Sequence, residues 1–308
     1  MAAPPFVPGV ALARGFFREH VEPVISAAAP NLSYSAGIVG PGSEVLEFDT
    51  VRSTDHHWGP RVMLFVETGQ RALIRDVSRA LAEALPHSYR GYPTGFTNPD
   101  TNDAGVQLMT AAKDGPVNHR CEFFEFDAWL EAQLGVPVGP SPTFEEWIGL
   151  PTQRLAEVTG GELFRDDLAM EKTREKLSWY PQDVWLYLMA GHWMRIAQEE
   201  HLTGRAAEVG DDLGSRLIAS RLVRDIMRLG FLMDRVYAPY AKWLGSAFER
   251  LPCAERLRDP LRGAVAASTW KARERALMTA LENLAEHHTR LEVTASRAPT
   301  ARRFHGRP

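Results

Sequence analysis

The feature that most constrains the fold is an abrupt change of pattern near residue 140. Before it, short apolar runs alternate with turn residues, whereas one helical pattern follows another after Thr143. The segment GVPVGPSP at residues 135–142 separates the two patterns, and its Pro and Gly content is typical of a linker. Because a single core rarely grows beyond about 250–300 residues, we predict two domains for this 308-residue chain, at residues 1–140 and 141–308.

Residues 1–140 carry the pattern of a mixed α/β sheet. Apolar runs rich in β-branched residues predict buried strands at 33–40 and 61–67, and a Gly-Pro-Gly-Ser turn follows the first of them. An alternating run predicts a third strand at 118–126. Helices are predicted at 15–28, 71–85 and 128–135. Residues 88–115, rich in Gly, Pro, Asn and Asp, predict a long loop, and loops of that length are often functional.

Residues 141–308 predict a helical bundle. Helical spacing of apolar residues extends over 182–201 and 212–236, and a last helix is predicted at about 260–288. The clearest apolar stripe lies in the second of these segments and consists of Ile218, Leu222, Ile226, Leu229, Met233 and Val236.

Composition excludes several classes of protein. The formal net charge of -4 argues against binding of extended nucleic acid, which needs a basic surface. Two cysteines, Cys121 and Cys253, are too few for a disulfide scaffold and fit reduced thiols in a cytoplasmic protein. The N-terminal segment lacks the basic region of a signal peptide, and no apolar run is long enough to span a membrane.

The segment from Gly42 to Gly59 contains a pattern suited to metal and phosphate binding. Gly42 and Ser43 form a small-residue turn after a strand, and Asp55 and His57 lie two residues apart, on the same side of an extended backbone. Nucleotidyl transfer uses divalent metal ions held by carboxylates beside a phosphate-binding turn. Asp55 is therefore a candidate metal ligand.

The same segment, GPGSEVLEFDTVRSTDHHWGPR, resembles the opening motif of the family known as domain of unknown function 4037, whose members resemble nucleotidyltransferases. The resemblance continues through WYPQDVWLYLMAGHW, QEEHLTGR, GDDLGSRLIASRLVRDIMRLGF and YAPYAKWLGSAF, and so covers residues 33–288. It implies an aminoglycoside (kanamycin) nucleotidyltransferase-like fold, Mg²⁺ as cofactor and ATP or another NTP as substrate. The nucleotide-binding residues it implies are Gly42, Ser43, Arg61 and Lys242.

One position departs from this pattern, because His57 occupies the place of a second carboxylate. A neutral imidazole prefers transition metals to Mg²⁺ and removes one negative charge. The resemblance implies metal binding by Asp55, His57 and a later carboxylate. The strand HRCEFFEF offers Glu122 and Glu125, and its periodicity does not choose between them. We assign catalysis to Asp55, His57 and Glu122, and metal binding to Asp55, His57 and Glu125.

A second group of candidates lies in the helical half of the sequence. Arg221, Arg224 and Arg228 fall at helical spacing beside the apolar stripe, and Tyr240 and Lys242 follow in YAPYAKW. The arginines and Tyr240 are predicted to bind the acceptor substrate. The alternative is an ion-paired, solvated helix face.

These observations predict a nucleotidyltransferase-like enzyme that transfers a nucleotidyl group from an NTP to a hydroxyl or amine of a small molecule in the cleft between the two domains. Two alternatives stay open. The His57 substitution either redirects the same fold to another small-molecule reaction in a biosynthetic pathway, or leaves a non-catalytic nucleotide-binding module. The sequence specifies neither the acceptor nor the oligomeric state.

Overall fold

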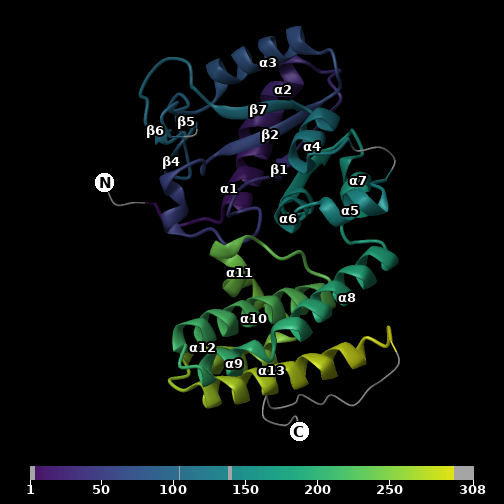
Figure 1. Cartoon of the computed structure of the whole chain (residues 1–308). Helices are drawn as coiled ribbons and strands as arrows, with labels where there is room; N and C mark the ends of the chain where they lie inside the picture. Colours follow the sequence, from purple (N-terminus) through teal and green to yellow (C-terminus); the bar gives the residue numbers. More distant parts are fainter. Residues whose placement is uncertain (1–3, 104, 138–140, 295–308) are drawn as a thin grey trace. The chain divides into compact units, whose positions relative to one another are not determined.

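The computed structural model describes residues 4–103, 105–137 and 141–294 (Figure 1). The chain divides into two units, residues 1–178 and 179–308, which we call the sheet unit and the helical unit. The division lies at 178/179, beyond the domain boundary at 140/141 that the sequence predicted, and residues 138–140 of the predicted linker lie outside the described residues. Among the described helices, none has the length and apolarity needed to cross a membrane.

A four-stranded mixed sheet organises the sheet unit, with strand order β7-β2-β1-β8. Strand β1 pairs antiparallel with both β2 and β8, whereas β2 pairs in parallel with β7. The predicted strands are therefore present, and the sheet gains a fourth strand from the region assigned to helices. The bounds are β1 Tyr34–Ile38, β2 Arg61–Val66, β7 Arg120–Glu125 and β8 Glu162–Asp166.

Strand β8 explains why residues 141–178 pack with the sheet. Ser35 of β1 donates its hydroxyl to Asp166 of β8 at 2.7 Å. Gly161 has φ of +67° and lies so close to the backbone of Ile38 that a side chain would collide with it, 1.9 Å from the carbonyl oxygen. Short helices surround this strand, at α5 Phe144–Gly149, α6 Thr152–Thr159 and α7 Met170–Lys176.

The two faces of the sheet have different roles. Val62, Leu64 and Cys121 belong to the hydrophobic core, together with residues of the N-terminal helices. Because side chains alternate along a strand, Arg120 and Glu122 lie on the opposite face. The core helices are α1 Gly9–Phe16, a π-helical turn at Phe17–Val21, α2 Glu22–Ala28 and α3 Arg71–Ala84, and α4 Phe126–Leu134 follows β7.

The predicted loop at residues 88–115 contains four short strands. They form two small antiparallel pairs, β3 with β4 and β5 with β6. The segment between β5 and β6 is held by backbone hydrogen bonds, including Asp100 N–H to Val106 O at 3.0 Å. The bounds are β3 Ser88–Tyr89, β4 Tyr92–Pro93, β5 Gly95–Phe96 and β6 Met109–Thr110.

The helical unit packs around α10, whose predicted apolar stripe is buried at Leu222, Ile226, Leu229 and Met233. The predicted helix at 260–288 is in fact two helices, because Thr269 caps the second one by accepting the N–H of Ala272. The bounds are α8 Gln182–Glu199, α9 Leu202–Glu208, α10 Asp212–Met233, α11 Ala241–Phe248, α12 Ala254–Ala266 and α13 Trp270–Arg290.

Candidate functional site

The Gly-Ser turn after β1 is joined to the segment that carries Asp55. Ser43 Oγ and Ser53 Oγ are hydrogen-bonded at 3.2 Å. Ser53 lies in a 3₁₀ helix, Val51–Asp55, whose N-terminus is capped by Thr50 in a capping box. The predicted turn and the predicted metal ligand therefore lie at the two ends of one locally braced segment.

A buried tryptophan and a carboxylate fix the same segment to the N-terminal helix. Asp49 Oδ2 accepts the backbone N–H of Gly9 at 2.6 Å and the indole N–H of Trp58 at 3.0 Å. The acidic side chain supplies an acceptor to the N-terminus of α1, where free N–H groups and the helix dipole favour negative charge. Asp49 thus has a positioning role.

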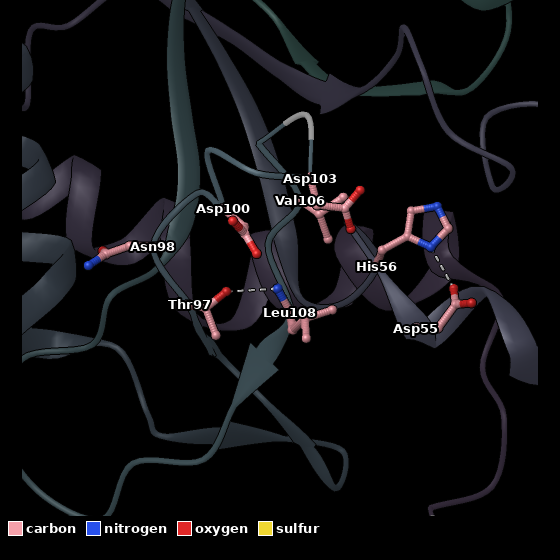
Figure 2. Close-up of a pocket in the computed structure, with 8 residues that line it drawn as sticks. All are labelled: Asp55, His56, Thr97, Asn98, Asp100, Asp103, Val106 and Leu108. Carbon is pink, nitrogen blue, oxygen red and sulfur yellow. Dashed lines mark hydrogen bonds and ion pairs between the residues drawn. The ribbon is translucent and has the colours of Figure 1, made fainter.

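Asp55 is exposed and lines a pocket of about 690 Å³ (Figure 2). Its carboxylate accepts from His56 Nδ1 at 2.6 Å. Two further carboxylates, Asp100 and Asp103, come from the segment between β5 and β6, and Asp100 Oδ1 also accepts the N–H of Asn102. The remaining lining residues are Thr97, Asn98, Val106 and Leu108. Three carboxylates from two separate segments therefore line one open pocket.

His57, rather than joining Asp55 in this pocket, contacts Arg120. The backbone of His57 has φ of +51°, and its N–H donates to Gln107 O at 3.0 Å. Arg120 Nη1 lies 2.7 Å from His57 Nδ1. Burial, followed by the charge of Arg120, lowers the pKa of His57.

This contact determines what the imidazole of His57 can bind. A guanidinium has donors but no acceptor, so Nδ1 of His57 must accept and the proton of the neutral ring resides on Nε2. Neither ring nitrogen then has a free lone pair for a metal ion. Metal binding by His57 remains a prediction that requires Arg120 to move away first.

The predicted nucleotide-binding residue Arg61 is buried in an ion pair. Arg61 donates to Glu44 Oε1 through Nε at 3.1 Å and Nη2 at 2.5 Å, and each side chain is only 6% exposed. Buried charges of this kind need their partners. Arg61 therefore neutralises Glu44, and phosphate binding by Arg61 stays a prediction.

The two candidates for the third carboxylate have different surroundings. Glu122 is paired in register with Met63 and lies 3.3 Å from Arg120 Nε. Glu125 is at the end of β7, opposite Val66 and on the other side of the strand from Glu122. Glu122 consequently shares a face with Arg61 and Arg120, while Glu125 does not.

The predicted residues of the helical unit lie on or near α10. Arg221 pairs with Glu199 at 3.0 Å, and Arg224 is exposed. Arg228 is half-buried, its Nε has no hydrogen-bond partner among the described residues, and burial lowers its pKa. Near α11, Tyr240 is exposed and the Lys242 ammonium lies 4.9 Å from the ring centroid of Trp243. Acceptor binding by these residues, and nucleotide binding by Lys242, remain predictions.

Sequence reasoning missed four residues of this region. Arg120 and Glu44 were detectable in principle, because Arg120 is two residues from Glu122 on one strand face and Glu44 follows the Gly-Ser turn directly. Asp100 and Asp103 lie in the loop that the sequence marked only as long and often functional. No local pattern connects them with Asp55, which is far away in sequence.

The acidic pocket offers oxygen ligands, although Asp55, Asp100 and Asp103 are not among the described side chains that lie close enough together for three of them to share one ion. Mg²⁺ prefers oxygen ligands and uses one or two carboxylates together with substrate phosphates. Asp55, Asp100 and Asp103 offer such oxygens. The neighbouring group of Glu44, Arg61, Arg120, Glu122 and His57 instead contains two guanidiniums balanced by two carboxylates. The charges of that group are therefore already paired with one another.

The fold and the site thus define a mixed α/β unit with an acidic pocket, followed by a helical unit. Residues 147–244 match the family described as a domain of unknown function (DUF4037). The matched residues begin in the sheet unit, at α5, and extend through α8 and α10 into α11. A comparison with curated proteins gives no match.

Proposed function

We propose that the sheet unit binds the phosphates of an NTP together with Mg²⁺ at the Asp55 pocket, and that the chain transfers the nucleotidyl group to a small-molecule acceptor. The observation that supports this most directly is that Asp55, Asp100 and Asp103 all line one pocket of about 690 Å³. Small-molecule sites usually fall between about 300 and 1,000 Å³, so the pocket has the volume for a nucleotide.

Each group in the region has a defined part in this proposal. The carboxylates of the pocket hold Mg²⁺, which bridges the phosphates and neutralises the charge that develops on them. The Gly42-Ser43 turn, braced through Ser53, is the candidate phosphate-binding turn. The attacking hydroxyl or amine of the acceptor displaces pyrophosphate from the α-phosphate, and Glu122 is the candidate to accept the proton.

The contact between His57 and Arg120 supports a second candidate function. Where a transferase of this kind has a second carboxylate, this chain has a neutral imidazole hydrogen-bonded to a guanidinium. That arrangement favours an anionic phosphate but provides one ligand fewer for Mg²⁺. Such a site binds nucleotide without transferring it, as a nucleotide-binding module.

Calorimetry with ATP and Mg²⁺ on the full chain tests nucleotide binding. The proposal expects binding by the wild type and an affinity lowered at least tenfold in Asp55→Asn, because the amide lacks the charge that holds the cation. Asp76→Asn is the matched control, since Asp76 is an exposed carboxylate of the same unit, paired with Arg79 on α3. If the wild type binds no NTP with Mg²⁺, with Mn²⁺ or with Zn²⁺, the proposal is wrong.

A single substitution separates transfer from binding alone. An aspartate tolerates the positive φ of position 57, so His57→Asp would provide the second carboxylate beside Arg120. Release of pyrophosphate from NTP is then measured for both proteins against a panel of hydroxyl and amine acceptors. Release by the wild type supports the transferase, whereas release only by His57→Asp supports the nucleotide-binding module.

A further inference from the structure

Three side chains of the helical unit, outside the proposed nucleotide site, bring their polar atoms together. Asp234 follows the C-terminus of α10, Cys253 precedes the N-terminus of α12, and His287 lies in the last turn of α13. One potential ligand atom from each residue lies within 4.8 Å of the others. The cluster is shielded from solvent, because the side chains of Asp234 and His287 are 5% and 15% exposed and Cys253 is buried.

The three groups are aimed at one another. His287 Nε2 lies 2.6 Å from Asp234 Oδ1, and the other carboxylate oxygen, Oδ2, accepts the backbone N–H of Cys253 at 3.0 Å. A hydrogen-bonded carboxylate oxygen fixes the orientation of its partner oxygen, as outer contacts of metal ligands do. The carboxylate of Asp234 is thus hydrogen-bonded to both of the other residues of the cluster.

Gly230 provides the space for the sulfur. It lies one helical turn before Asp234, whose N–H donates to Gly230 O at 2.9 Å. A Cβ atom at position 230 would be only 2.9 Å from Cys253 Sγ. A larger residue there would push the thiol away from the carboxylate, so the close approach of α10 to Cys253 depends on this glycine.

The surroundings of the cluster suit a bound cation rather than a free thiolate. Burial raises the pKa of the Cys253 thiol and the neighbouring Asp234 carboxylate raises it further, so the thiolate forms as a metal ion displaces the proton. The C-terminus of α10 lies beside Asp234, and helix C-termini favour positive charge. A metal ion in the cluster would meet a carboxylate, a helix C-terminus and an imidazole lone pair.

We propose that Asp234, Cys253 and His287 bind one Zn²⁺ ion, with a water molecule as the fourth ligand. Thiolate, imidazole and carboxylate are the three ligand types of protein zinc sites, and a thiolate selects against Mg²⁺ and Ca²⁺. Zinc–ligand distances near 2.0–2.3 Å separate tetrahedral ligand atoms by about 3.4 Å. The Asp234–His287 pair therefore moves apart by less than about 1 Å as the ion replaces the proton between them.

Cobalt substitution of the full chain tests this site directly. The protein is stripped of metal with a chelator under reducing conditions and titrated with Co²⁺, a spectroscopic substitute for Zn²⁺. One equivalent is expected to produce the d–d absorption of a tetrahedral ion and a thiolate-to-Co²⁺ charge-transfer band. One equivalent of Zn²⁺ is expected to abolish both signals.

The chain offers matched controls for two of the three ligands, Cys253 and His287. Cys253→Ala is expected to lose the charge-transfer band, while Cys121→Ala, which removes the other buried thiol, keeps it. His287→Gln is expected to weaken Co²⁺ binding at least tenfold, while His288→Gln, the adjacent histidine, leaves it unchanged. Far-UV circular dichroism of each variant confirms folding. His287→Gln can still hydrogen-bond Asp234, so it remains informative if Cys253→Ala does not fold.

The possible outcomes separate a zinc site from a hydrogen-bonded cluster. No stoichiometric band in the wild type, or a band that survives Cys253→Ala and disappears in Cys121→Ala, overturns the proposal. Gly230→Ala gives an additional test, because a Cβ there displaces the sulfur. It is expected to reduce Co²⁺ affinity, and unchanged affinity contradicts the proposed ligand arrangement.

Discussion

The polar cluster of the sheet unit and that of the helical unit illustrate two ways of burying charge. In the first, Glu44 neutralises Arg61, and Glu122 approaches Arg120. The positive and negative groups are already paired with each other. In the second, Asp234, Cys253 and His287 all have the chemistry of metal ligands, and no arginine or lysine is among the three. The first cluster is complete without a ligand, whereas the second has the composition of a site that takes up a cation.

The two clusters also differ in how the chain assembles them. Parallel pairing of β2 with β7 places Arg61 beside Arg120 and Met63 beside Glu122 through strand register alone. The helical cluster instead comes from residues next to the ends of α10 and α12 and in the last turn of α13. Strand register brings the first cluster together, while the second depends on how whole helices pack.

The largest expected effect is on the stability of the sheet unit. Glu44→Ala leaves Arg61 buried without its partner, which costs about 3–5 kcal/mol in comparable cases. Asp76→Ala removes a carboxylate from an exposed pair with Arg79 and is expected to cost about 0–1 kcal/mol. Urea unfolding, followed by hydrogen exchange of β2 amides, measures both. If Glu44→Ala lowers the free energy of unfolding by less than about 1 kcal/mol, the Arg61–Glu44 pair does not behave as a desolvated ion pair.

Zinc is expected to stabilise the helical unit selectively. An ion that binds only the folded state contributes about 2.7 kcal/mol when its free concentration is one hundred times Kd. Hydrogen exchange of amides in α10 and α12 should slow accordingly, while exchange in β2 should not. His287→Gln should remove most of this protection. Equal protection of both units would indicate that the metal does not distinguish the two clusters.

The third prediction concerns the carboxylates of the open pocket. Asp100→Asn keeps the acceptor for the N–H of Asn102 but removes a charge, so we expect about tenfold weaker binding of ATP with Mg²⁺, or about 1.4 kcal/mol. Asp114→Asn, an exposed carboxylate of the same long segment that does not line the pocket, is the control. Calorimetry measures both, and equal effects would indicate general electrostatics rather than a site.

The smallest effect is a pH dependence within the sheet unit. His119 donates Nε2–H to Ser78 O at 3.0 Å, and its Nδ1 accepts the N–H of Cys121 at 3.2 Å, so the folded ring is neutral. Burial lowers the pKa of His119 below its usual 6.5. His119 therefore takes up a proton near pH 6.5 in the unfolded chain but stays neutral in the folded unit. The free energy of unfolding consequently falls as the pH drops below that value.

His119→Gln measures this contribution. The free energy of unfolding of the wild type falls by at most about 1.4 kcal/mol for each pH unit between the unfolded and folded pKa values of His119. Below the folded pKa this decline ends. Thermal unfolding of metal-free protein from pH 7.5 to pH 5 should show a shallower decline for His119→Gln than for the wild type. His56→Gln, which removes an exposed histidine of the same unit, is the comparison variant. Equal slopes for the wild type and His119→Gln would contradict the prediction.

Much of the fold was accessible from the sequence because local patterns encode it. The strands at 34–38, 61–66 and 120–125 fall inside predicted runs, and α3, α8 and α10 lie within one to three residues of their predicted bounds. These elements bury one face or both, and burial leaves a periodic trace in the sequence. The strand β8 was missed because the sequence around it reads as part of a helical region, and only its pairing with β1 makes it a strand.

The candidate site was accessible only in part. The Gly-Ser turn and Asp55 were identified from a single segment, and Asp55 does line a pocket. The partners of the other predicted residues come from distant positions: Arg120 reaches His57, and Asp100 and Asp103 join Asp55. Long-range partners of this kind leave no local spacing to detect.

The sequence by itself determined the class of most elements and the change from a sheet-containing part to a helical part, because hydrophobic period and turn residues are local properties. The tertiary structure decided which charges meet. It pairs Arg61 with Glu44 and places His57 in contact with Arg120. It also brings Asp234, Cys253 and His287 together from the ends of three helices. The strength of an electrostatic or metal-ligand interaction depends on distance and burial in space, and separation along the chain specifies neither.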